Sequence, residues 1–132
     1  MNKLTQYGHP FQTKALAALV TDRDFLQQSA DIVSPEYFDS DASKWIVRKT
    51  LTYFSEYRTT PTMEVFKVET EKIQNEVQAV AVKEQLKETY KSSQVKDLAY
   101  IKDTFLDFCK NQTLKNALIR SVDLLELGDY DD

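Results

Sequence analysis

Glycine and proline are scarce in this chain, which has two glycines and three prolines among 132 residues. Average usage gives about 16 of these residues in a chain of this length. Hairpin turns and barrel corners depend on them, so their shortage argues against a fold rich in β-strands. The long apolar patterns have a helical period instead. The sequence therefore predicts an all-α fold.

Cysteine and histidine each occur once, as Cys109 and His9. One cysteine cannot form an intramolecular disulfide, and the two residues are too few for a Cys/His metal cluster. Cys109 lies beside an apolar stripe, which favours a buried, inert thiol over a nucleophile. His9 has tyrosine, glycine and proline neighbours near the N-terminus, so we expect an exposed loop residue rather than a general base. We predict no catalytic residue and no cofactor.

Two pairs of aspartates, Asp22 with Asp24 and Asp39 with Asp41, are the candidates for a cation site. Aspartate just before an apolar helical pattern is also a helix cap, and its charge favours the first turn of a helix. Capping and solvation explain all four residues without a ligand. We therefore expect no metal site.

Phosphate-binding loops and basic clusters are also missing. Gly8 is followed by His9 and Gly128 by Asp129, so no Gly-Lys-Ser/Thr loop can hold a triphosphate. The net charge is −4, and the basic residues are spread over the whole chain rather than gathered in a patch for nucleic acid. The aromatic residues lack interleaved lysines and arginines, which favours core packing over base stacking. We expect no nucleotide site and at most weak DNA binding.

Long hydrophobic runs are absent too. The longest early uncharged apolar stretch, residues 15–21, is too short to cross a bilayer, and no secretory signal precedes it. A single cysteine fits a reducing compartment. We expect a soluble cytoplasmic protein with no membrane partner.

Capping residues and apolar spacing predict the helices of the first half. The pattern after Pro10 indicates a helix ending near Thr21, with Asp22 capping a short helix after it. Ser34 before Pro35 and Thr60 before Pro61 are start signals for further helices. The central helix is expected over 41–57, with Asp39, Ser40 or Asp41 as its cap, and its apolar positions include Trp45, Tyr53, Phe54 and Tyr57.

After Pro61, a helical pattern continues through Val77 and Val80 to about Tyr90, and residues 91–94 are typical of a polar turn. We expect residues 1–97 to form a compact helical unit, termed the head. Its core is predicted to contain Leu16, Leu19, Phe25, Phe38, Trp45, Phe54 and Phe66, with Phe105 contributed by the segment that follows.

Residues 98–132 are predicted to form one long helix, ending near Gly128, and an acidic end at 129–132. Apolar residues step by three and four in two sets that are out of phase, Leu98, Ile101, Phe105 and Phe108, then Leu114, Leu118, Val122 and Leu125. A helix from 97 to 127 is about 46 Å long, whereas a globule of this size is roughly 36 Å across. The second half should therefore protrude, and its apolar stripe needs a partner to cover it.

Three segments also resemble a known family. They are "FQTKALAALVTDRDFL", "DIVSPEYFDSDASKWIVRKTLTYFSEYRTTPT" and "DLAYIKDTFLDFCKNQTLKNALIRSVDLLELGDYDD". In type and order they resemble the N-terminal domain of hexameric replicative DNA helicases of the DnaB type, closest to those of T-even-like phages. The resemblance covers nearly the whole chain and is weakest over residues 74–94.

The resemblance implies a non-catalytic assembly and docking domain. In that family, helical hairpins pair between subunits and arrange these domains above the motor ring. Carried over, Leu114, Leu118, Val122 and Leu125 form the subunit interface on the first hairpin helix. The implied partners are other helicase subunits and a primase or helicase loader, in the cytoplasm of the phage host. The second hairpin helix, linker and ATPase motor of the family are not in this sequence, so we expect an excised or truncated part of such a helicase.

An alternative from another class is a free-standing phage adaptor or regulator that dimerises through the same last helix. A reading frame that continues past Asp132 into a phosphate-binding loop distinguishes the helicase domain from the adaptor. A third hypothesis is a small helical enzyme. It is disfavoured because the sequence has no set of histidine, cysteine or paired carboxylate residues that could form a catalytic site.

The charge pattern generates a first prediction. Because phosphate contacts dominate non-specific affinity, an acidic chain without a basic patch should show no measurable nucleotide binding and at most weak binding to single-stranded DNA at physiological salt. Fluorescence anisotropy with labelled oligonucleotides and a nucleotide analogue measures both. Micromolar affinity for single strands would contradict the prediction.

Overall fold

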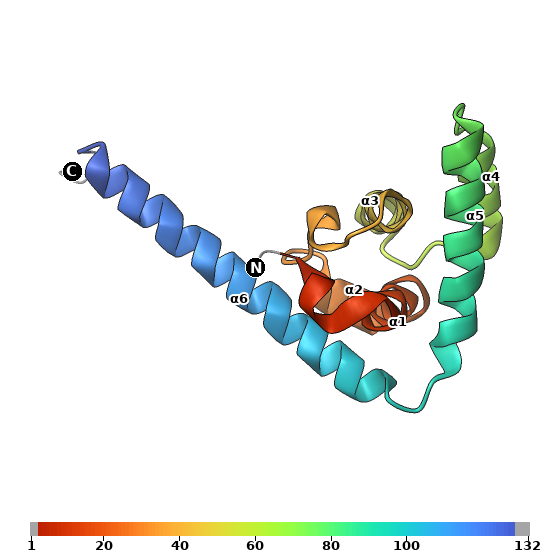
Figure 1. Ribbon diagram of the computed structural model, residues 1–132, viewed down its shortest axis with the longest axis horizontal. Coiled ribbons are helices and arrows are strands. Elements are labelled where there is room, and N and C mark those ends of the chain that lie inside the picture. The colour runs from red at the N-terminus through yellow and green to blue at the C-terminus, as the bar shows by residue number, and fades with distance from the viewer. Residues whose placement is uncertain (1–2, 129–132) are drawn as a thin grey trace.

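The computed structural model describes residues 3–128, and within that range the chain is mostly helical with no strand (Figure 1). The α-helices are α1 (Gly8–Thr21), α2 (Arg23–Ser29), α3 (Asp41–Tyr57), α4 (Met63–Glu71), α5 (Glu76–Lys91) and α6 (Leu98–Glu126). Three short 3-10 helices join them, η1 (Leu4–Tyr7), η2 (Pro35–Tyr37) and η3 (Ser92–Gln94). The predicted all-α fold is confirmed. The expected acidic end at 129–132 lies outside the described residues.

Side-chain caps set several of the helix boundaries. Asp22 accepts a hydrogen bond from the backbone N–H of Phe25 at 3.1 Å and so begins α2, as its sequence context predicts. Of the three candidate caps for α3, Ser40 is the one used, and it accepts from the N–H of Ser43. Each cap satisfies a backbone N–H that has no partner within the helix.

Two of the expected boundaries differ in the structure. Ser34 does cap the segment after it, but Pro35 begins only the 3-10 helix η2. The α-helix expected at Pro61 begins instead at Met63, because the Thr62 hydroxyl accepts from the Val65 N–H.

The expected single helical run from Pro61 to Tyr90 is wrong, because it is divided into α4 and α5. Asn75 leaves the helical conformation and caps α5, and its side chain accepts from the Gln78 N–H at 3.0 Å. Asparagine side chains compete with the helical backbone in this way. Val77 and Val80 are largely exposed in the first turns of α5 and do not extend the core stripe.

The core forms around α1, which is buried over most of its length between α5 and α6 (Figure 1). Its segment from Ala15 to Val20 is buried at every position. This explains why α1 is apolar on most of its faces. The eight residues expected in the core are all buried, namely Leu16, Leu19, Phe25, Phe38, Trp45, Phe54, Phe66 and Phe105.

Helix α6 runs along one side of the head, and its C-terminal half extends beyond it (Figure 1). It is continuous through residues 110–113, where the apolar pattern changes phase. Ile101, Phe105 and Phe108 are buried against the head, whereas residues 113–128 are all exposed. Gly128 has φ +80°, the left-handed conformation of a residue that ends a helix. We call the exposed part of α6, residues 113–126, the arm.

Burial of Trp45 generates the second prediction. The side chain is 8% exposed within the core cluster. Truncation in Trp45→Ala should lower the free energy of unfolding by about 3–5 kcal/mol, through lost transfer energy and a cavity. Urea denaturation followed by circular dichroism measures the change.

Tyr57→Ala on the same helix is a matched control, because that side chain is 62% exposed. Its effect should stay within about 0.5 kcal/mol. Equal losses in the two variants would contradict the placement of Trp45 in the core.

Candidate assembly interface

An aromatic cluster holds α6 to the head just before the arm begins. The ring of Phe108 meets the rings of Tyr37 and Tyr7 edge-on, with centroids 5.2 Å and 6.1 Å away. Tyr7 in turn stacks on Phe11 of α1 at 4.6 Å. Such pairs contribute beyond the area they bury. The cluster joins η1, η2 and α1 to one turn of α6, so it fixes the point from which the arm leaves the head.

Two ion pairs hold the beginning of α6 to the first two helices of the head. Lys102 Nζ lies 2.6 Å from an Asp22 carboxylate oxygen and also 5.9 Å from the centre of the Phe25 ring. At the first turn, Lys14 of α1 reaches Asp97 at 3.0 Å. The pKa of Asp22 is lowered, chiefly by its hydrogen bond with Lys102, while burial opposes the shift. Contacts with α1 and α2 thus support α6 along its buried half.

The arm presents its apolar residues on a different face from the buried half of the same helix. The buried stripe consists of Leu98, Ile101, Phe105 and Phe108, and the arm stripe of Leu114, Leu118, Val122 and Leu125. At 100° per residue, the centres of the two stripes lie about 130° apart around the helix axis. The arm stripe cannot turn toward the head, because the helix is continuous and rigidly attached at Phe108. Its members are 51–60% exposed, Leu114, Leu118, Val122 and Leu125. The structure therefore brings the four predicted interface residues together on one open face.

The apolar surface of the arm is broader than the sequence pattern predicted. Ile119, Leu124 and Leu127 are also exposed, and they lie outside the stripe. Their signal in the sequence was weak because they do not follow the three-and-four spacing. An exposed apolar stripe such as that of Leu114, Leu118, Val122 and Leu125 is rare on monomers and is typical of sites where another protein binds.

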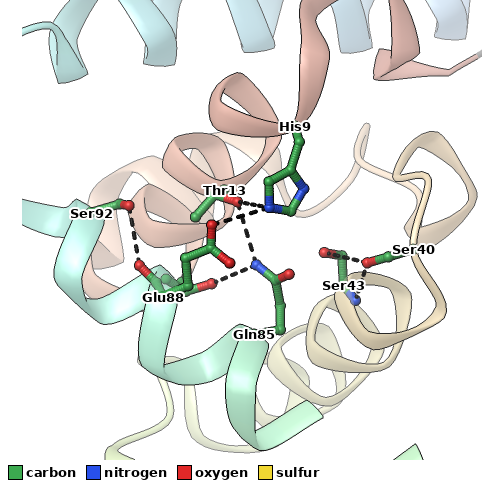
Figure 2. Close-up of polar contacts among 8 residues, drawn as sticks. His9, Thr13, Ser40, Ser43, Gln85, Glu88 and Ser92 are labelled. Atoms are coloured by element: carbon green, nitrogen blue, oxygen red, sulfur yellow. Dashed lines mark hydrogen bonds and ion pairs between the residues drawn. The ribbon is translucent and has the colours of Figure 1, made fainter. Parts of the chain in front are cut away.

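The sequence predicted an exposed loop residue at His9. His9 is exposed, but it lies in α1 and belongs to a polar network between α1 and α5 (Figure 2). It belongs to the first turn of α1, and its Nε2 atom is 3.1 Å from Glu88 and 3.3 Å from the Thr13 hydroxyl. Gln85 donates to Thr89 and also approaches Thr13. Both contacts of His9 use the same nitrogen, so the ring does not bridge hydroxyl and carboxylate as in a catalytic triad. The network links two helices of the head.

The remaining candidate residues have structural surroundings. Cys109 is fully buried, and burial raises the pKa of its thiol to about 12, which disfavours the nucleophilic thiolate. Asp39 accepts hydrogen bonds from Thr5 and Gln12, while Asp24 and Asp41 are exposed. Over residues 3–128, no three histidine, cysteine or acidic side chains gather as they do around a metal ion.

The head also carries a groove of about 670 Å³ between α3 and α4. Tyr53 and Tyr57 line it with their ring centroids 4.6 Å apart, and Val68 of α4 is exposed beside them. The sequence placed both tyrosines on the apolar stripe of the central helix. In the structure Tyr53 is half-buried but Tyr57 is 62% exposed, so the buried stripe of α3 does not reach its last turn.

Comparison with family models, curated proteins and solved structures found no match. Within residues 3–128, no helix combines the length and the apolar character needed to cross a bilayer. The interpretation of the arm therefore depends on its own geometry.

The Asp22–Lys102 pair generates the third prediction. Because the folded pKa of Asp22 lies below its unfolded value of about 3.9, the pair stabilises the fold fully above roughly pH 5. That stability is lost as the pH falls through the lowered folded pKa. Lys102→Met should therefore reduce the loss of unfolding free energy between pH 5 and pH 2, measured by urea denaturation at each pH.

Lys110→Met, at an exposed position of the same helix, is the control and should leave the pH dependence as in the wild type. If Lys102→Met left the slope between pH 5 and pH 2 unchanged, the pair would not anchor α6.

Proposed function

We propose that this chain is a non-catalytic assembly and partner-docking domain of a DnaB-type replicative helicase of a phage. In this proposal the arm binds the equivalent element of other subunits, and the head offers surfaces to a primase or helicase loader. Unwinding belongs to the ATPase motor of such a helicase, since this chain has no phosphate-binding loop.

The observation that carries the proposal is the arm itself. The head needs only the first half of α6 for its core. The helix nevertheless continues for about four more turns, with three leucines and one valine on an open face. Exposed apolar side chains bring no stability to the monomer. A surface of this kind is explained by a partner that covers it.

The strength of this contact follows from its size. Covering the four stripe residues contributes about 1.5–3 kcal/mol each, or about 6–12 kcal/mol in gross terms. Association costs an estimated 4–15 kcal/mol in lost freedom before any affinity appears. One arm therefore supports a weak dimer or a monomer at micromolar concentration, and a stable hexamer needs further elements. This fits a domain that assembles together with a larger protein.

The head supports the docking part of the proposal through the groove between α3 and α4. Tyrosines are frequent in protein interfaces, because they bury a large ring and keep a polar hydroxyl at the edge. Tyr53 and Tyr57 have this arrangement at the groove. The groove lies on helices that do not contribute to the arm, so docking and assembly use separate surfaces.

The fourth prediction tests assembly through the arm. Leu118 lies in the middle of the apolar stripe, so Leu118→Glu should abolish self-association by placing a charge where apolar surface is to be buried. Sedimentation velocity over a concentration series measures the association, and circular dichroism checks that helical content and head stability are nearly unchanged.

Val77→Glu provides a matched control, since Val77 is 82% exposed on α5 and far from the arm in sequence. This variant should associate like the wild type. A Leu118→Glu protein that associates like the wild type would move the interface elsewhere, and a wild-type hexamer that resists dilution would refute the estimate of a weak arm.

A further inference from the structure

The groove between α3 and α4 has a glutamate on each wall. Glu56 comes from the last turn of α3 and Glu64 from the first turn of α4, and both residues are exposed. Within residues 3–128, no basic side-chain nitrogen lies within 4.0 Å of the Glu56 carboxylate. Glu64 has one such neighbour, Lys67 at 3.7 Å, in an exposed pair of the kind that contributes little. Both carboxylates are therefore open to a cation from outside.

The one lysine in the lining of the groove is already engaged. Lys49 has its Nζ atom 3.1 Å from Glu69 of α4 and 5.6 Å from the centre of the Trp45 ring. Arg58 follows α3, but its guanidinium lies over the Phe54 ring at 5.8 Å, and the residue lines a different hollow. The lining contains three glutamates and one lysine, which gives a formal charge of −2. The groove therefore favours a positively charged ligand.

Two tyrosine rings lie beside these carboxylates. Tyr53 and Tyr57 are one turn apart on α3, with ring centroids 4.6 Å apart and ring planes tilted by 39°. Glu56 is three residues from Tyr53, and residues at this spacing are neighbours on a helix surface. The face of an aromatic ring attracts a cation through its quadrupole. A cation that contacts these rings is therefore within reach of a carboxylate.

Arginine is the cation that fits this combination best. Its guanidinium is planar, so it stacks on an aromatic ring, and its fork of N–H groups donates to carboxylates. The ammonium of lysine is a compact, strongly hydrated charge without this stacking surface. The α4 wall of the groove also offers apolar surface, from Val65, the exposed Val68 and the buried Phe66. Apolar side chains next to the arginine are stabilised by packing there.

We propose that this groove binds a segment of a partner protein in which an arginine is flanked by apolar residues. The guanidinium contacts the Tyr57 ring and pairs with Glu56 and Glu64, and the flanking side chains pack on Val65 and Val68. This binding rests on the docking role of the head in the proposed function and specifies the chemistry of the partner. A basic segment also complements the chain as a whole, whose net charge is −4.

A nucleic-acid strand is a poorer occupant of the same groove. Tyrosine rings also stack on unpaired bases, but sites of that kind follow the phosphates with basic residues. Most of the charged residues that line this groove are glutamates, which repel phosphate. The charge of the lining thus selects a protein segment over a single strand.

Titration of the full 132-residue chain with a blocked Leu-Arg-Leu tripeptide, followed by NMR of the backbone amides, tests the proposal. The shifts should concentrate at the end of α3 and the beginning of α4. The matched peptide Leu-citrulline-Leu has the same shape without the charge. It should bind about threefold to tenfold more weakly, because it loses the cation–π contact and the ion pairs. A citrulline peptide that binds as tightly, or an arginine peptide that causes no shifts in the groove at millimolar concentration, would overturn the assignment.

Substitutions in the groove separate the roles of its charge and its rings. Glu56→Gln and Glu64→Gln should each raise the dissociation constant for Leu-Arg-Leu by about twofold to fivefold and leave that for the citrulline peptide unchanged. Tyr57→Leu keeps an apolar side chain without the ring and should weaken the arginine peptide by a similar factor. Glu84→Gln on α5 is the matched control, because Glu84 is exposed and does not line the groove. Equal effects of Glu84→Gln and the two groove variants would indicate a general attraction to an acidic protein and contradict a specific site.

Binding in the groove and assembly through the arm are distinguishable in the same experiment. Leu118→Glu should bind the peptide like the wild type, and a loss of binding in that variant would place the site on the arm instead. Groove amides that shift with protein concentration when no peptide is present would identify a second copy as the occupant. A stronger response to oligothymidylate than to the peptide would identify a nucleic-acid site, and either result would overturn the proposed partner.

Discussion

The structure depends on one constraint, which is that α6 is a single continuous helix with two apolar stripes on different faces. A rigid helix cannot turn both stripes toward the same head when they differ by about 130°. The first stripe, with Phe105 and Phe108, completes the core. The second stripe must then point away from the head. The protruding arm follows from this mismatch of phase and from the length of the helix.

The two halves of α6 also differ in what stabilises them. The buried half has the aromatic cluster around Phe108 and the Lys102 ion pair with Asp22. Residues 113–126 of the arm are all exposed, and an isolated helix of about 15 residues is marginal in water. A partner that covers the arm would therefore stabilise its helix as well as bury its apolar surface. In the proposed function, the helical segment that assembles is the exposed one, which the head does not cover.

The sequence predicted those features that depend on local chemistry. The central helix begins and ends where its apolar pattern does, and Asp22 caps α2. Whether the last helix breaks at the phase change over 110–113 was left open by the sequence, and the structure shows that α6 is continuous there. The sequence did not predict the break at Asn75, because an asparagine cap competes with a helical pattern that continues on either side.

The exposure of Tyr57 was missed for a different reason. The spacing of apolar residues identifies which face of a helix is apolar. How many turns of that face a neighbouring helix covers depends on tertiary packing, which the spacing does not show. The contact of His9 with Glu88 joins positions far apart in the sequence, and a lone histidine gives no signal of such a partner.

The central claim, that the arm is an assembly surface, is tested most directly by amide hydrogen exchange at two protein concentrations. At low micromolar concentration, amides from Leu118 to Leu125 should exchange much faster than those from Ile101 to Phe108, because only the latter are held by the head. At several hundred micromolar, the arm amides should slow markedly while the head amides stay the same. Arm amides whose exchange does not change with concentration would contradict the account.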